Sequence, residues 1–181
     1  MSEESTLEPK LESKPESTLE PPKQPSTKSS KKTKTIISPI SILNSNISFG
    51  PSDQSKDNTD DFKKLKVDAI INCQGEFKYP TDATYDLFNF EFDNDEGATL
   101  MEHIDGVIQV IDSLLKQRKK MYVQCKTGDS ISPAILIYLL MVRKEMNLER
   151  AYRNVYKIRP TIDINSYFLA ELQTVDEWCV Y

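Results

Sequence analysis

The chain is poor in the features that would place it outside the cell or in a membrane. Its three cysteines, Cys73, Cys125 and Cys179, are widely spaced and fit neither a disulfide framework nor a zinc-binding pattern. The longest apolar run, residues 134–142, is far too short to span a bilayer. The opening residues MSEESTLEPK have no apolar core, so we expect no secretory signal. We therefore expect a protein of a reducing compartment, the cytosol or the nucleus, with no membrane anchor.

Histidine is also scarce, and positive charge is outnumbered by negative charge. His103 is the single histidine and falls in a helical pattern, so we expect no metal site and no cofactor. The net charge is -5 at pH 7. A general nucleic-acid-binding protein would show a basic surface instead, so we expect no nucleic-acid partner.

The first 35 residues differ from the rest of the chain. They consist mainly of Glu, Lys, Ser, Thr and Pro, and ESTLEP occurs at 4–9 and again at 16–21. Such a segment cannot bury enough apolar surface to offset its lost chain entropy, so we predict a disordered tail over residues 1–35. Its seven lysines and six glutamates give +1 and leave -6 for residues 36–181. We interpret the basic stretch Lys28–Lys34 as a solvated linker, with a nuclear signal or a docking site as alternatives.

From residue 36 onward, short apolar stretches alternate with amphipathic ones. The pattern predicts strands at 36–43, 46–50, 69–73, 85–93 and 121–125, and helices at 60–68, 99–120, 132–145, 148–159 and 164–178. Alternating strands and helices indicate an α/β fold, with one sheet covered on both faces. Ligands in such sheets bind at the carboxyl ends of the strands, which is where Cys125 lies.

The stretch VQCKTGDSIS, residues 123–132, joins a predicted strand to a buried helix. If that helix begins near Ser132, its free N–H groups and its dipole point at the loop. Gly128 permits a turn that aims backbone amides inward. A helix N-terminus stabilises a thiolate, so Cys125 is well placed as a nucleophile that attacks phosphorus. The alternative is an ordinary turn after a buried cysteine.

These segments resemble the dual-specificity protein phosphatase family of cysteine-dependent phosphatases. QCKTGDSIS stands where the family has HCxxGxxRS, so Cys125, Gly128 and Ser132 match. NISFG resembles the family's LYLG segment, LKVDAIINC its LGITHILNV strand, ERAYRNVYKIRP its EAxxxVRxxRP helix and NSYFLAELQTVDEW its NxxFxxQLxxxE helix. The resemblance runs from about residue 36 to the C-terminus. It implies a single domain over 36–181, with a central, mixed but mostly parallel sheet flanked by helices.

The resemblance also implies a site. Cys125 takes the nucleophile position, and the phosphate loop comprises Lys126, Thr127, Gly128, Asp129, Ser130, Ile131 and Ser132. Ile131 replaces the family's arginine, whose planar fork would hold two phosphate oxygens. Losing one preorganised donor costs roughly 3 to 4 kcal/mol of barrier. Gln124 replaces the histidine that, in the family, helps to keep the thiol ionised.

Three further residues bear on the loop. Asp129 brings a carboxylate that would repel a phosphate dianion and disfavour a thiolate, unless Lys126 offsets it. Ser132 either hydrogen-bonds the thiolate or caps the helix, and we favour the cap. Arg159 matches a family arginine, and we expect it to have a structural role at the end of its helix.

The family's general acid, an aspartate that protonates the leaving oxygen, belongs on the segment FDNDEG, residues 92–97. Counting back from Cys125 places Asp93 there. Counting back from the next helix places Asn94 there instead, and Asp95 is adjacent. The alternative is a solvated acidic loop that caps the helix.

We interpret the chain as a catalytically inactive dual-specificity phosphatase, a pseudophosphatase, that binds phosphoproteins, protein kinases or other signalling partners. Because Ile131 replaces the arginine that would bind phosphate, we expect partners to bind through surfaces other than the pocket. One alternative is a weakly active protein phosphatase that acts on phosphotyrosine, phosphoserine or phosphothreonine through a Cys125 phosphocysteine. Another is an interaction subunit that works through its tail.

Overall fold

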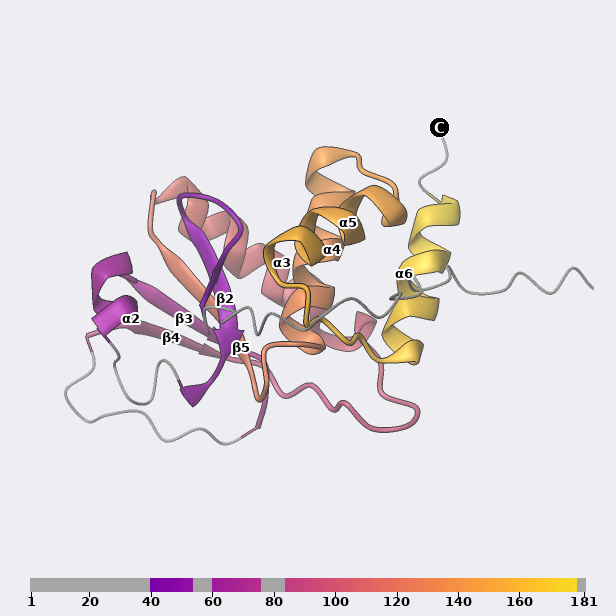
Figure 1. The fold of residues 1–181 in the computed structure, drawn as a ribbon, viewed down its shortest axis with the longest axis horizontal. Coiled ribbons are helices and arrows are strands. Elements are labelled where there is room, and N and C mark those ends of the chain that lie inside the picture. The colour runs from indigo at the N-terminus through magenta and orange to yellow at the C-terminus, as the bar shows by residue number, and fades with distance from the viewer. Residues whose placement is uncertain (1–39, 54–59, 76–83, 179–181) are drawn as a thin grey trace, which may run out of the picture. The chain divides into compact units, whose positions relative to one another are not determined.

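A five-stranded sheet forms the centre of the fold. The computed structural model describes residues 40–53, 60–75 and 84–178 (Figure 1). The strands are β1 (Ser41–Ile42), β2 (Ile47–Pro51), β3 (Ala69–Asn72), β4 (Asp86–Asn89) and β5 (Met121–Cys125). Their order in the sheet is β1-β2-β5-β3-β4, with β1 antiparallel to β2 and the other pairs parallel. The predicted mixed, mostly parallel sheet is confirmed. The predicted tail, 1–35, including Lys28–Lys34, lies outside the described residues.

Helices flank this sheet. They are α2 (Asp60–Leu65), α3 (Met101–Lys116), α4 (Ile131–Lys144), α5 (Leu148–Ile158) and α6 (Ser166–Trp178). Figure 1 shows α3, α4, α5 and α6 grouped together, with α2 apart from them beside β3 and β4. Within the described residues, no helix has both the length and the apolar character needed to cross a membrane.

Side chains that alternate along the strands build a core on each face of the sheet. Ile71 and Val123 belong to the large apolar cluster that α3, α4, α5 and α6 complete. Their neighbours Ile70 and Tyr122 point to the other face, where they form a smaller cluster against Leu65 of α2. Both faces are therefore covered, as the mostly apolar sequence of β3 predicts.

Some predicted element boundaries agree with the structure to within one or two residues, and others are shorter than predicted, such as α2, which ends at Leu65 instead of residue 68. Asn165 caps α6, because its Oδ1 accepts the Tyr167 N–H at 2.9 Å. The strand predicted at 85–93 is only β4, which lies at the edge of the sheet with mostly exposed side chains. The helix predicted at 99–120 ends at Lys116, and Arg118 then adopts a left-handed φ of 57° as the chain turns into β5.

Candidate active site

Cys125 is the last residue of β5 and lies beside the N-terminus of α4. Only 2% of its surface is exposed to solvent. Its Sγ lies 3.3 Å from the Ser132 Oγ and 3.5 Å from the Ser132 backbone N, whose N–H it accepts. A hydroxyl and a helix amide are the donors that suit a thiolate. The favoured prediction for Ser132, a helix cap, is wrong: α4 begins at Ile131, Ser130 holds the cap position, and Ser132 faces the sulfur.

Gly128 allows the loop that follows Cys125 to close against β2. Its φ is +76°, and a Cβ there would lie 2.5 Å from the backbone carbonyl carbon of Gly50. The Ser52 N–H also donates to the Cys125 carbonyl at 3.0 Å. The end of β2 and the loop are therefore in direct backbone contact, and only glycine fits between them.

Arg159 holds the loop from the end of α5. It is 6% exposed, and its Nε donates to the Asp129 Oδ1 at 2.7 Å while its Nη2 donates to the Thr127 carbonyl at 3.1 Å. The Thr161 hydroxyl donates to the same Asp129 oxygen at 2.8 Å. We expected Asp129 to repel a phosphate dianion unless Lys126 offset its charge, and the structure provides a different counter-charge. The charge of Asp129 is met by Arg159, and the pair fixes the loop; the structural role expected for Arg159 extends from the helix to the loop.

Ile131 occupies the first position of α4, where the resemblance places an arginine. It is 5% exposed and belongs to the large apolar cluster. Its side chain offers no hydrogen-bond donor. Lys126, the cation at the start of the loop, is exposed to solvent. The inner side of the loop therefore has backbone amides and hydroxyls but no guanidinium from this position.

The segment 92–97 meets the loop through Asn94 rather than through Asp93. The Ser130 hydroxyl donates to the Asn94 Oδ1 at 2.8 Å. The Asn165 Nδ2 then donates to the Asn94 carbonyl at 3.0 Å. Asp93 and Asp95 are exposed, and neither makes a side-chain hydrogen bond to the described residues of the loop. The acid position therefore stays a prediction, Asp93 by one counting and Asn94 or Asp95 by the other; if it is Asn94, its amide has no proton to give to a leaving group.

Gln124 points to the face of the sheet opposite the Cys125 thiol, because consecutive strand residues alternate. Its Nε2 donates to the Asn72 Oδ1 at 3.2 Å, and the Asn72 Nδ2 donates to the Asn89 Oδ1 at 3.1 Å. These amides form a ladder across β5, β3 and β4. The residue that replaces the family's histidine is therefore part of the sheet, and any effect on the thiol runs through the backbone.

Two buried side chains near the site have raised pKa values. Burial raises the pKa of the Cys73 thiol well above its usual value, and the neighbouring Cys125 adds to the shift. Burial likewise raises the pKa of Tyr122, whose hydroxyl donates to the Pro51 carbonyl at 2.9 Å. Of the two described cysteines, Cys125 is the one whose sulfur accepts a backbone N–H, that of Ser132. In the described part of the chain, no group of three or more His, Cys, Asp or Glu side chains could hold a metal ion.

Comparison of the sequence with known protein families identifies the family of this domain. A profile of the family described as "Dual specificity phosphatase, catalytic domain" matches residues 51–177. The chain belongs to this phosphatase family. The matched region includes Cys125 and the loop that follows it.

Two curated relatives are much longer than this chain. It is 28% identical over 123 residues to Protein phosphatase Slingshot of Drosophila melanogaster, which covers 68% of this chain and 12% of that protein. It is 31% identical over 118 residues to human Protein phosphatase Slingshot homolog 3, which covers 64% of this chain and 18% of that protein. The chain therefore spans less than a fifth of the length of either relative.

Among solved structures, the human tyrosine phosphatase-like serine/threonine/tyrosine-interacting protein has the same fold. The TM-score is 0.69 at 17% identity, and the match covers 78% of this chain and 98% of that chain. At this identity the likeness is one of architecture, and it extends over nearly the whole of that chain.

Proposed function

We propose that this chain is a dual-specificity phosphatase domain without useful turnover, a pseudophosphatase that acts by binding a signalling partner. The observation that carries the proposal is the buried Ile131 at the first turn of α4. Phosphoryl transfer leaves little covalent chemistry to the protein, so catalysis depends on positioning and on charge stabilisation. An apolar side chain supplies neither at the place where the family has its arginine.

A second deficit adds to the first. In this proposal the Asn94 side chain, bound to Ser130, takes the acid position, and it cannot protonate a leaving oxygen. A positioned general acid contributes typically about 10²- to 10⁴-fold, and the lost donor at position 131 is worth roughly 3 to 4 kcal/mol. Together these losses would lower turnover by several orders of magnitude relative to a complete site.

The shape of the site is nevertheless maintained. Gly128 still packs on Gly50, and Arg159 still binds Asp129 and the Thr127 carbonyl. A scaffold kept in this form suits recognition of a phosphoprotein, a protein kinase or another signalling protein. Because the guanidinium clamp is missing, the binding energy comes mainly from surfaces outside the loop.

One observation favours a second function, that of a weakly active protein phosphatase. The Cys125 sulfur retains the Ser132 hydroxyl and amide as donors. In this alternative the thiolate attacks phosphorus of a phosphotyrosine, phosphoserine or phosphothreonine, and the side-chain oxygen leaves with a proton from water. Water then hydrolyses the phosphocysteine to inorganic phosphate and regenerates the thiol. The third function, action through the tail, concerns residues outside the described part of the chain.

Turnover of a fluorogenic aryl phosphate by the full chain separates these functions. Cys125→Ser, purified in parallel, is the matched control because it changes one atom and removes the nucleophile. The pseudophosphatase proposal expects the wild type and Cys125→Ser to be indistinguishable. Turnover that Cys125→Ser abolishes would establish the weakly active phosphatase instead.

A further inference from the structure

In the described part of the chain, β4 is an edge strand of the sheet. β4 comes last in the strand order, and the N–H groups of Asp86 and Phe90 donate inward, to the Asp68 carbonyl at 3.0 Å and the Asn72 carbonyl at 2.8 Å. Pairing groups alternate along a strand, so the N–H and C=O groups of Leu87 and Asn89 face away from β3. In the described parts of the chain no strand pairs with that side. Such an edge accepts a further strand from another protein.

A hollow of about 260 Å³ lies beside this edge, between β4 and α3. Its apolar lining comes from Phe88 of β4 and from Val110 and Leu114 of α3. Polar side chains also line it: Gln109 and Ser113 of α3, Gln117 just after α3, and the ion-paired Asp86 and Lys119, whose position we call its polar end. The hollow is large enough for one aliphatic side chain of a strand paired with β4, because alternate residues of that strand would point toward α3.

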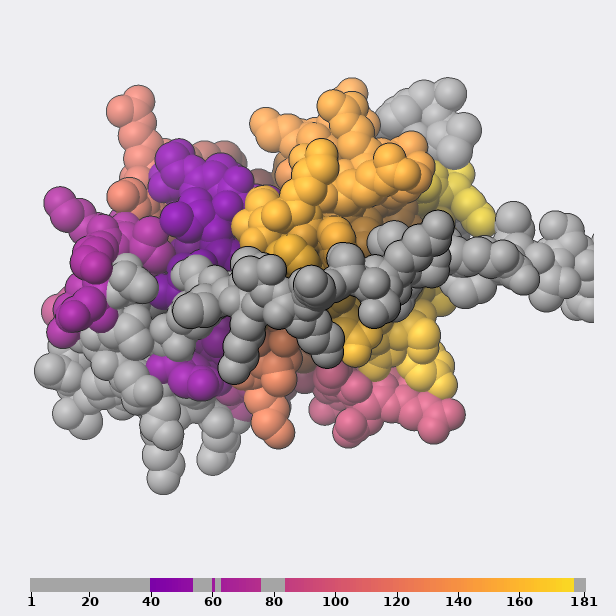
Figure 2. Space-filling model, in the orientation of Figure 1, coloured from indigo at the N-terminus to yellow at the C-terminus, as the bar shows by residue number. Residues whose placement is uncertain are grey.

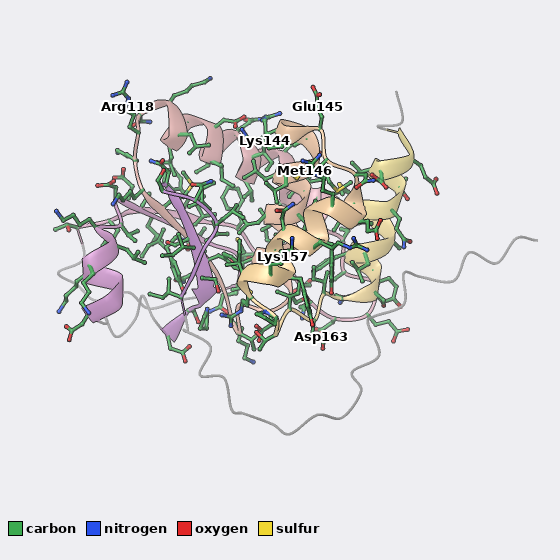
Figure 3. All side chains as sticks on the ribbon, turned by 45° about the horizontal axis from the view of Figure 1, so that its top comes forward. Arg118, Lys144, Glu145, Met146, Lys157 and Asp163 are labelled. Atoms are coloured by element: carbon green, nitrogen blue, oxygen red, sulfur yellow. The ribbon has the colours of Figure 1, made fainter. Side chains whose placement is uncertain are left out.

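Positive charge gathers at the polar end of the hollow. Lys116 ends α3, and the turn that joins α3 to β5 contains Arg118, Lys119 and Lys120, in a domain whose residues 36–181 sum to -6. Lys119 forms an ion pair with Asp86, which ties the turn to the first residue of β4. Figure 3 shows Arg118 directed outward from this corner, and Figure 2 shows the turn projecting from the surface. The turn itself is fixed by backbone hydrogen bonds from Arg118 to Leu115 and from Lys119 to Leu114.

We propose that the β4 edge, the hollow and the basic turn form a docking surface for an extended acidic segment of a partner protein. The segment adds to β4 as a strand and places one apolar side chain between Phe88 and α3. Its Asp or Glu side chains lie beside Lys116, Arg118 and Lys120. Main-chain hydrogen bonds give the affinity, while the hollow and the charges give the selectivity.

The features of this surface favour a carboxylate-rich peptide over other anions. A sheet edge pairs with a peptide backbone, which neither a nucleic acid nor a lipid surface provides. The cations are spread along an exposed turn instead of converging on one point, which suits a run of carboxylates better than a single phosphate. The surface does not include the phosphate loop, so its test is independent of whether Cys125 turns over a substrate.

Two fluorescein-labelled peptides, EEETLTVT and its reverse TVTLTEEE, probe both strand directions by fluorescence anisotropy with the full chain. We expect one of them to bind. The uncharged counterpart with Gln for Glu and the counterpart with N-methyl groups at alternate backbone amides should each bind at least about tenfold more weakly. Failure of both acidic peptides to bind, or binding that survives N-methylation, would overturn the proposal.

Variants of the protein locate the site. The double variant Arg118→Glu/Lys120→Glu should weaken the bound peptide at least about tenfold. Lys144→Glu/Lys157→Glu makes the same charge change at exposed positions of α4 and α5, and should leave the peptide unaffected (Figure 3). Equal loss in both pairs would mean a general charge effect and would overturn the proposed location.

A third variant tests the strand edge itself. Leu87→Pro removes an outward N–H while sparing the inward ladder to β3, which edge strands tolerate. It should abolish peptide binding and leave unfolding cooperative. Unchanged binding in Leu87→Pro would overturn strand addition. Tighter binding of a phosphoserine peptide, an anionic vesicle or a DNA duplex than of either acidic peptide would overturn the assignment of the partner.

Discussion

The shape of the phosphate loop depends on one glycine, and a second glycine provides its control. Gly128 and Gly97 both have positive φ, but only Gly128 lacks room for a Cβ, since no described atom lies within 4 Å of that position at Gly97. We expect Gly97→Ala to lower the free energy of unfolding by about 1 to 2 kcal/mol, the cost of the left-handed conformation. Gly128→Ala should lower the free energy of unfolding by about 1 to 3 kcal/mol more, because the added methyl group would also clash with the backbone of β2. Urea denaturation compares them, and equal losses would contradict the packing described.

The buried thiol and phenol near the site make the fold sensitive to alkali. Burial raises the pKa of both Cys73 and Tyr122, so above the ordinary pKa values the unfolded chain binds fewer protons than the folded one. The free energy of unfolding should therefore fall as the pH rises through about 8.5 and then through about 10. Cys73→Ala and Tyr122→Phe should each reduce this slope, by up to about 1.4 kcal/mol per pH unit.

Urea denaturation at several alkaline pH values measures that slope. Tyr167→Phe is the control, since it removes a phenol from a residue that is 40% exposed. If the Cys73 and Tyr122 variants follow the wild type in parallel, ionisation of these two side chains does not limit the folded state.

Single residues also show which features of the site can be predicted from the sequence and which cannot. Cys125 and Gly128 were predictable because a strand, a turn and a helix N-terminus form a local pattern. Arg159 and Asp129 are 30 residues apart in the chain. The sequence shows both charges, but it does not show that they lie close enough to form an ion pair. The contacts of Asn94 with Ser130 and Asn165 were not predictable, because the path of the irregular segment 92–97 depends on residues remote in the chain.

Among the elements, α6 stabilises two other helices through their N-termini. Glu171 accepts the Leu100 N–H at 2.6 Å and the Thr99 hydroxyl at the start of α3. Asp176 accepts the Leu148 N–H at 2.9 Å at the start of α5. Carboxylates in these places satisfy free amides and complement the helix dipole. The closing helix is therefore part of the frame that holds segment 92–97 against the loop.

Glu171→Gln tests this capping while keeping the size of the side chain. We expect a loss of about 1 to 2 kcal/mol in the free energy of unfolding, the usual range for a helix cap with charge. Glu149→Gln is the matched control, because Glu149 forms an exposed pair with Arg153 one turn along α5 and should cost at most about 0.5 kcal/mol. Thermal or urea unfolding gives both values. Equal losses would show that α6 does not act through capping.

Element order was readable from the sequence, but element ends were not. β3, β5 and α4 are mostly apolar in sequence, with few polar residues such as Asn72 and Gln124, which fits a covered sheet and a buried helix. A predicted helix end can easily be wrong by one or two residues, and an error of one residue mattered at the start of α4. Starting at Ile131 instead of Ser132 turned Ser132 from a helix cap into a partner of the thiol.

At the scale of the whole molecule, the residues that maintain the fold differ from those on which the family's chemistry depends. The fold rests on the sheet, on Gly128 and on the Arg159–Asp129 pair, and all of these are present. A shared fold does not imply a shared function. In the function proposed here, charge stabilisation and proton donation fail at Ile131 and Asn94, whose side chains carry neither a positive charge nor an acidic proton.

Restoring the missing groups tests this account most directly. Asn94→Asp, Gln124→His and Ile131→Arg, combined in the full chain, would return an acid, the histidine and the charge clamp. Aryl phosphate turnover is measured for the wild type, for the triple variant and for each with Cys125→Ser, after cooperative unfolding confirms that all four are folded. We predict a silent wild type and a triple variant whose turnover disappears with Cys125→Ser. A wild type that already turns over substrate through Cys125, at a rate the triple variant does not exceed, would contradict it.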